Sequence, residues 1–172
     1  LGPTFWALGL GMPTAITAET KGYDPKIHSE FYPAGVKITF EFAATEKNGP
    51  MKIIWHDGEH GIPRPKVFEG TDRKVVGTGA VVHGTEGAIM HGSHGAGGCR
   101  LIPEERMKDF KRPPETIARV PGGQHQKDWL SAIREGKEAG SNFEYGGALS
   151  EIGLLGMIAI QRSGKRLEWD AD

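Results

Sequence analysis

Four side chains that could ligate a transition metal lie within one short stretch of the sequence. They are His83, His91, His94 and Cys99, and imidazole and thiolate groups suit zinc or another borderline metal. Their spacing matches no compact zinc motif, and the many glycines between them do not favour a preformed site. The stretch is therefore interpreted as a glycine-rich hairpin and loop, and we predict no metal site.

A second candidate is the run Trp55-His56-Asp57-Gly58, which ends a predicted strand and enters a loop. Binding residues often lie at such positions. The ring of Trp55 could stack on a sugar or a nicotinamide, with Asp57 close by. The alternative is a core tryptophan followed by an Asp-Gly turn. We retain Trp55 and Asp57 as candidate substrate-binding residues.

His125 stands at the predicted start of a helix, where the helix dipole favours the neutral imidazole. Such an imidazole could hydrogen-bond a sugar hydroxyl or support a catalytic group; alternatively, His125 caps the helix or packs against Trp129. Ser150 and Glu151 are predicted to lie in the first turn of the next helix and to satisfy its backbone donors. The sequence contains no dinucleotide-binding, P-loop, serine-hydrolase or zinc-protease motif. We therefore predict neither catalytic nor cofactor-binding residues.

The clearest strand is predicted over residues 36–42, where apolar and polar side chains alternate. One face would carry Val36, Ile38, Phe40 and Phe42, and the other Lys37, Thr39 and Glu41. Such alternation indicates a sheet with one buried and one polar face. Residues 51–56 would complete a hairpin with it, and residues 80–83 and 88–91 a second hairpin. Further strands are predicted over residues 14–20, 99–102 and 165–170, with loops over 23–33, 63–77, 92–98 and 112–123.

Helices are predicted over residues 1–10, 103–110, 125–135 and 147–163. In the third, Trp129, Leu130 and Ile133 would form the inner stripe. The fourth is apolar on nearly every side, so we predict that it is buried all round and too short to span a bilayer. Strands that come first, with helices collected late, favour an α+β fold in one domain, residues 1–172. Its sheet would be open-faced and mostly antiparallel, with helices on one face.

Composition narrows the classes of partner. The formal net charge is −1 and both signs are interspersed, so nothing indicates a nucleic-acid or anionic-membrane partner. The single cysteine excludes an intrachain disulfide. Glycine is frequent, with 26 residues, which indicates many tight turns. Because the chain begins with Leu1 and not Met, we expect a fragment of a longer protein whose localisation cannot be predicted.

Several segments, in this order, resemble one known family. They are FWALGLGMPTAITAE, KITFEF, MKIIWHDG, HGTEGAIM, LIPEERM and, most specifically, SNFEYGGALSEIGLLG and KRLEWD. Over nearly its whole length the chain closely resembles the C-terminal domain of bacterial oxidoreductases of the glucose–fructose oxidoreductase and inositol dehydrogenase family (Gfo/Idh/MocA).

The resemblance implies a two-domain enzyme whose first, Rossmann domain binds NAD or NADP and is absent from this sequence. This chain would be the substrate-binding and oligomerisation domain for a sugar or polyol, inactive alone, with no cofactor of its own and a sheet face that packs on a second subunit. The predicted substrate-binding residues are His125, Trp55, Asp57 and Trp6. The family's catalytic histidine would lie ahead of Leu1, and its frequent aspartate is replaced here by Gly2.

Two alternatives stay open at this point. Some relatives are NAD-dependent glycosidases, and no carboxylate pair in this chain distinguishes them from dehydrogenases. A self-standing ligand- or metal-binding module is the third interpretation.

Overall fold

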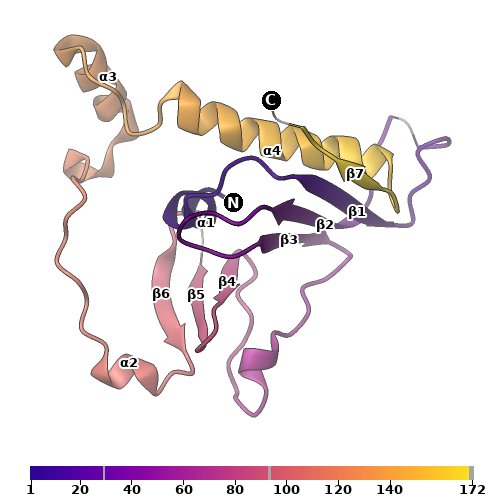
Figure 1. Ribbon diagram of the computed structural model, residues 1–172, viewed down its shortest axis with the longest axis horizontal. Coiled ribbons are helices and arrows are strands. Elements are labelled where there is room, and N and C mark those ends of the chain that lie inside the picture. Colours follow the sequence, from indigo (N-terminus) through magenta and orange to yellow (C-terminus); the bar gives the residue numbers. More distant parts are fainter. Residues whose placement is uncertain (29, 93, 171–172) are drawn as a thin grey trace.

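The chain forms an α+β fold whose strands are divided between two antiparallel sheets (Figure 1). The computed structural model describes residues 1–28, 30–92 and 94–170. Sheet A has the strand order β3-β2-β1-β7, with β1 at Ala15–Lys21, β2 at Gly35–Phe42, β3 at Met51–Gly58 and β7 at Arg166–Glu168. Sheet B has the order β4-β5-β6, with β4 at Gly79–His83, β5 at Ala88–Gly92 and β6 at Gly97–Ile102.

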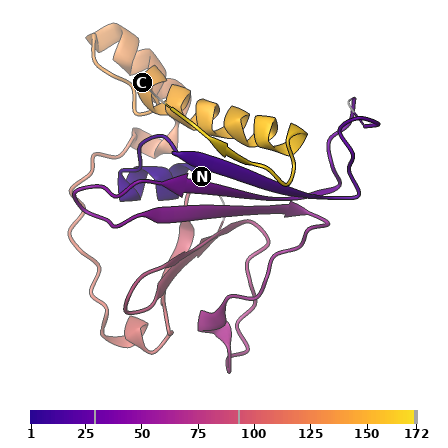
Figure 2. The ribbon, with the colours of Figure 1, turned by 45° about the vertical axis from the view of Figure 1, so that its right-hand side comes forward.

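The described residues form four α-helices. They are α1 at Gly2–Leu8, α2 at Arg106–Asp109, α3 at His125–Glu135 and α4 at Phe143–Gln161, with 3₁₀ turns at Lys66–Phe68 and Pro121–Gly123. Helix α4 packs on β1 and β2 of sheet A, α2 contacts β6, and sheet B lies beyond the β3 edge of sheet A (Figures 1 and 2). The α+β class and the antiparallel pairing are confirmed, and the strands form two sheets where the sequence suggested a single one.

The core of sheet A follows from the alternation in β2. All four predicted inward residues, Val36, Ile38, Phe40 and Phe42, are buried. They form one apolar cluster with Ile16 and Ala18 of β1 and Ile152, Leu155, Ala159 and Ile160 of α4. Full burial of a large apolar side chain contributes about 1.5–3 kcal/mol, so this cluster is the main apolar contribution to the packing of α4 on the sheet. The predicted hairpin of β2 with β3 is confirmed by a register that pairs Phe42 with Met51.

Sheet B has an apolar cluster of its own. Phe68, Ala88, Met90 and Ile102 are buried together beneath the turn at Lys66–Phe68. The predicted hairpin of β4 and β5 is confirmed, with His83 opposite Ala88. β6 begins at Gly97, earlier than predicted, and part of the predicted 92–98 loop lies outside the described residues.

The start of α4 was predicted too late. The side chain of Asn142 accepts a hydrogen bond from the backbone N–H of Tyr145 at 2.9 Å, which is the usual role of an N-cap asparagine. The helix therefore begins at Phe143. The first-turn role predicted for Ser150 and Glu151 is wrong, because Ser150 Oγ donates to the carbonyl of Gly146 at 2.8 Å and Glu151 is exposed within the helix.

The prediction that α4 is buried on every side is also wrong. One stripe faces the sheet, and Leu154, Met157 and Ile158 on the outer side are 58%, 39% and 49% exposed. The length argument against a membrane span fails as well. Within the described residues α4 is the one helix that passes a test of length and composition for crossing a membrane. This is weak evidence for a span, because a core helix passes the same test and α4 packs on β1 and β2.

Helix α3 has its predicted bounds, but its predicted inner stripe is exposed. Trp129 and Ile133 are more than 60% exposed and Leu130 is 45% exposed, and only Ala132 of this helix is buried. Figure 1 shows why: α3 stands away from both sheets, at the end of the extended segment that follows α2. The amphipathic pattern predicted the helix correctly but not what would cover it.

We expect Gly156 to set the distance between α4 and sheet A. A Cβ atom at this position would lie 3.1 Å from the ring of Phe40 and 3.3 Å from Ile38. Replacing Gly156 with leucine should lower the free energy of unfolding by about 1–3 kcal/mol through overpacking, measured by urea denaturation. Gly153→Leu is the matched control, because the space around Gly153 is open. An equal loss in both variants would contradict this account.

Candidate binding cleft between the two sheets

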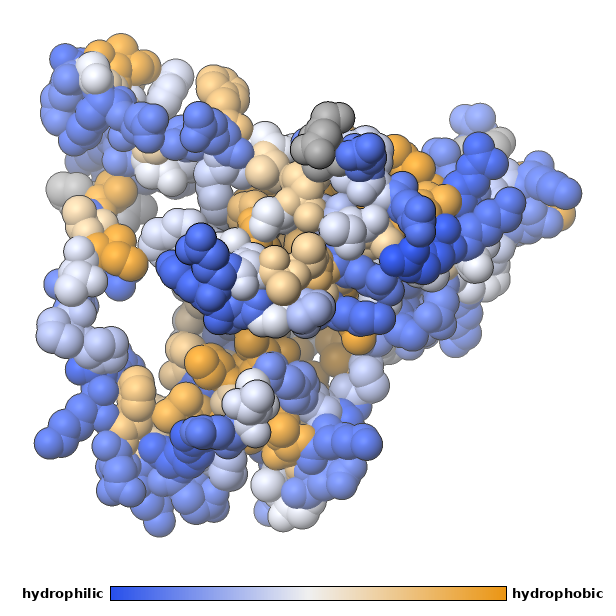
Figure 3. Space-filling view, viewed as in Figure 1, coloured by the Kyte–Doolittle hydropathy of each residue, from blue (hydrophilic) through white to orange (hydrophobic). Residues whose placement is uncertain are grey.

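A large cleft lies between the facing edges of the two sheets. It measures about 610 Å³ and runs between β3 and β4. Leu1, Thr4 and Leu8 line it from the N-terminal segment and α1. Figure 3 shows apolar residues gathered where sheet A meets sheet B. A cavity of this size with mostly apolar walls and a few polar groups is typical of a small-molecule site.

Trp55, His56 and Asp57 line the cleft from β3. Because β3 is an edge strand of sheet A, its outer backbone edge is not paired within the sheet. Trp55 lies opposite Ile38 and is 42% exposed, so the interpretation of it as a core tryptophan is wrong. Asp57 Oδ1 accepts a hydrogen bond from the backbone N–H of Gly58 at 2.8 Å, which leaves its second carboxylate oxygen for other contacts.

The opposite wall comes from β4 and the segment before it. Its apolar part consists of Val75, Val76, Ala80, Val81 and Val82, and its polar part of Thr78 and His83. Ile62 and two prolines of the β3–β4 connection, Pro63 and Pro65, line the same cleft. The β3 wall therefore carries Trp55 and Asp57 on one face of the strand and His56 on the other, and the β4 wall is mostly branched and apolar. Such a cleft suits a ligand with an apolar ring face and hydroxyl groups.

His56 is a titratable cleft residue in a partly desolvated environment. Its Nδ1 is buried and has no hydrogen-bond partner in the described part of the chain. Burial lowers the pKa of His56 below its usual range, and the nearby His60 and Lys37 lower it further. The rings of His56 and His60 lie 6.0 Å apart. His56 is therefore a neutral imidazole near pH 7, able to donate one hydrogen bond and accept another.

The structure brings together two of the four predicted substrate-binding residues. Trp55 and Asp57 share the cleft, whereas Trp6 is exposed on α1 and is not among the residues that line it. His125 is exposed at the first residue of α3, which Figure 1 places away from β3. His56 was missed as a site residue. The sequence places it between two candidates, and the register confirms the alternation of the strand: His56 lies opposite Lys37 on the polar face, whereas Trp55 and Asp57 lie on the other face.

The four predicted metal-ligand candidates are spread over sheet B and its loop. His83 lies at the end of β4, and His94 and Cys99 are exposed. His91 is buried in β5, and neither of its ring nitrogens has a partner among the described residues. Within residues 1–28, 30–92 and 94–170 no group of three or more His, Cys, Asp or Glu side chains is placed to hold a metal ion.

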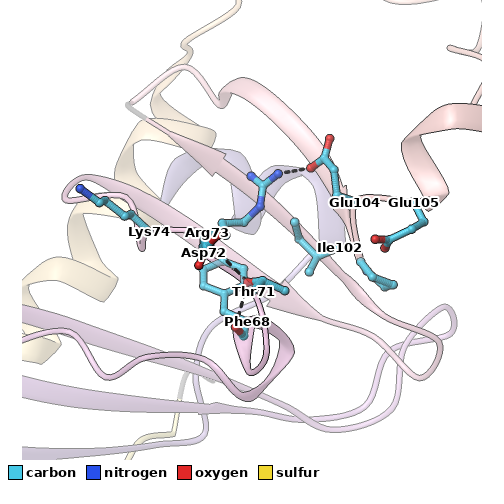
Figure 4. Close-up of a pocket in the computed structure, with 9 residues that line it drawn as sticks. Phe68, Thr71, Asp72, Arg73, Lys74, Ile102, Glu104 and Glu105 are labelled. Carbon is cyan, nitrogen blue, oxygen red and sulfur yellow. Dashed lines mark hydrogen bonds and ion pairs between the residues drawn. The ribbon is translucent and has the colours of Figure 1, made fainter.

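A second pocket, of about 490 Å³, lies between the segment before β4 and the end of β6 (Figure 4). Phe68 and Ile102 form part of its lining. Figure 4 shows the guanidinium of Arg73 directed at the carboxylate of Glu104, and Arg100 Nε also donates to Glu104, at 2.7 Å. Two arginines thus share one carboxylate. We interpret this pocket as a structural junction that ties the segment before β4 to the end of β6.

Comparison with known proteins adds no identification. No family model matches the chain. No curated protein and no solved structure matches it either.

The environment of His56 predicts a pH dependence of stability. Because the folded protein depresses its pKa from about 6.5, the unfolded chain takes up a proton first as the pH falls. The free energy of unfolding should therefore decrease as the pH drops from 6.5 through the lowered pKa, and His56→Gln should flatten this decrease. Denaturation at pH 7.5, 6.5 and 5.5 measures it.

His125→Gln, an exposed histidine outside the cleft, is the control and should leave the slope unchanged. Hydrogen bonds lower the pKa values of Glu19 and Glu41, so their stabilisation is lost only below about 4.5. The two effects fall in separate pH windows. An unchanged slope in His56→Gln would show that the imidazole is not desolvated.

Proposed function

We propose that this chain is the substrate-binding and assembly domain of an NAD(P)-dependent sugar or polyol oxidoreductase, of the Gfo/Idh/MocA family that its sequence resembles. The observation that carries the substrate part of the proposal is the half-exposed ring of Trp55, which shares the cleft and one face of β3 with Asp57. The faces of sugar and cyclic polyol rings carry C–H groups that pack on an indole, while their hydroxyls need neighbouring polar groups.

In this proposal the cofactor belongs to a separate Rossmann domain, where the nicotinamide would exchange a hydride with the substrate. The residues of this chain would bind and orient the substrate. Neutral His56 would hydrogen-bond a hydroxyl group, and the Asp57 carboxylate would accept a second hydroxyl hydrogen. Positioning of this kind is a large part of the catalytic effect in hydride transfer. The chain alone is expected to have no oxidoreductase activity.

The substrate proposal is tested by binding of monosaccharides and cyclic polyols to the chain. We expect weak binding, detected by saturation-transfer NMR and quantified by calorimetry. Trp55→Ala should weaken it about tenfold, since an aromatic contact contributes about 0.5–1.5 kcal/mol beyond its buried area. Trp129→Ala, which removes an exposed tryptophan outside the cleft, should have no effect. Equal affinity in both variants, or no binding by any member of the panel, would refute the proposal.

The assembly part of the proposal concerns the face of sheet A opposite α4. Glu41, near the end of β2, binds Lys52 of β3 at 3.1 Å and Arg166 of β7 at 3.0 Å, and Arg166 also binds Glu168 at 3.1 Å. A further pair, Lys37 with Glu19 at 2.6 Å, lies on the same face. Since these charges are already paired within the chain, the face can meet a second copy without burying an unpaired charge.

Thr39 lies half-buried in the middle of this face, opposite Thr17 of β1 and Ile54 of β3. We expect the chain to self-associate through the face about a two-fold axis. Thr39→Arg should weaken this contact, because a new charge would lie near its own symmetry mate. Sedimentation velocity at tens of micromolar measures it, and Thr85→Arg in the β4–β5 turn is the control. A variant at Thr39 that associates as the unmodified chain does would exclude this face.

A further inference from the structure

The outer side of α4 is an apolar helix face that this chain does not cover. Phe143, Leu154, Met157 and Ile158 are 98%, 58%, 39% and 49% exposed. At 3.6 residues per turn they lie on the side opposite the buried stripe, together with Gly147, Ser150 and Gln161. Both views place sheet A on the other side of this helix (Figures 1 and 2). Scattered exposed apolar residues need no explanation, but Leu154, Met157 and Ile158 are neighbours at helical spacing and form one patch, with Phe143 about 16 Å away at the start of the helix.

The glycines of this helix support the same interpretation. Gly156 has a packing reason in the contact with Phe40, but a Cβ atom at Gly146, Gly147 or Gly153 would meet nothing within 4 Å. Each glycine inside a helix costs about 0.8–1 kcal/mol relative to alanine. The described part of this chain offers no contact that requires them. Glycine at these positions allows the backbone of another helix to approach closely.

The charged residues of α4 indicate which helix could approach its outer face. Glu144, Glu151 and Arg162 are spaced by 7 and 11 residues, so they lie on one flank of the outer face. None of the three has an ion pair with any described residue, in contrast to the paired charges of sheet A. In an antiparallel pair of identical helices centred near Gly153, Glu144 of one copy meets Arg162 of the other. A two-fold axis repeats this ion pair, and the opposed helix dipoles lie side by side.

We infer that the outer face of α4 binds the same face of a second copy of this chain, with the two helices antiparallel about a two-fold axis near Gly153. A lipid surface fits less well, because α4 is packed on sheet A along one side and carboxylates flank its exposed side. The contact is separate from the face of sheet A and does not depend on the proposed substrate. One helix face is smaller than the roughly 800 Å² per partner of a standard interface, so we expect a micromolar dissociation constant.

A charge exchange tests the geometry. All variants carry Thr39→Arg, so that any association through sheet A is absent. Glu144→Arg and Arg162→Glu should each raise the dissociation constant about fivefold, because each creates a like-charge pair twice per dimer. The double variant should have a dissociation constant within about twofold of that of the Thr39→Arg background. Residues 144 and 162 are about 27 Å apart along one helix, so rescue cannot arise within a single chain.

Cysteine cross-linking gives an independent measurement that does not rely on weak ion pairs. In a Cys99→Ser background, Leu154→Cys should form a disulfide-linked dimer on mild oxidation, because the two copies of residue 154 meet near the axis. Thr85→Cys, exposed in the β4–β5 turn, is the control and should stay monomeric. Circular dichroism confirms that each variant is folded, and polyol binding, which uses the cleft, should be unchanged in all of them.

Cross-linking at residue 154 together with rescue by the double variant would establish the contact. Three results would overturn it: a monomer at 100 μM in the Thr39→Arg background, no rescue in the double variant, or equal cross-linking at residues 154 and 85. Co-sedimentation with phosphatidylcholine vesicles that Leu154→Glu abolishes, without self-association, would assign the helix face to a membrane and would also refute the proposal.

Discussion

The packing of α4 on β1 and β2 is the interaction on which the rest of this fold depends. Gly156 lets the helix approach until its backbone is next to the ring of Phe40, and the buried stripe of the helix completes the core from above. The end of the helix is then held to β1, since Gly164 N donates to Ala18 O at 2.8 Å and the hydroxyls of Ser163 and Thr20 lie 2.9 Å apart. This connection directs the following residues into β7 beside β1.

The position of the cleft is a consequence of that packing. With β1 and β2 under the helix and β7 added beyond β1, β3 is the edge of sheet A. Sheet B is stabilised by a separate cluster around Phe68 and Met90, so it does not need β3 to form. The two sheets therefore stand with unpaired edges facing each other, and the residues at the end of β3 line the space between them. A single continuous sheet would have left no cleft at this position.

Much of the fold could be predicted because it depends on local sequence patterns. The alternation in β2, the two hairpins and the ends of α3 all depend on neighbouring residues, and the structure confirms them. The start of α4 was missed although the cap residue, Asn142, was visible in the sequence. No local sequence pattern shows which element will cover an apolar helix face. The apolar residues of α3 and of the outer side of α4 were predicted to be buried, and they are exposed because no described element lies over them.

The candidate site shows the same limit. Trp55 and Asp57 are close in the sequence, so their common position in the cleft could be anticipated, whereas Trp6 and His125 depended on how distant elements assemble. The environment of His56 could not be predicted either, since its desolvation comes from tertiary packing and its neighbours Lys37 and His60 belong to β2 and to the turn after β3.

The two proposed assembly surfaces differ in whether their charged side chains form ion pairs within the chain. On sheet A, Glu41 has two cationic partners within the chain, so burying this face needs no charge from outside. On α4, no ion pair of Glu144 or Arg162 is found among the described residues, and in the proposed dimer the second copy would supply their partners. A face whose charges are already paired does not favour one orientation of a partner. Unpaired charges favour the orientation that brings opposite charges together. In the proposed dimer, the charged flank of α4 would therefore set the relative orientation of the two copies.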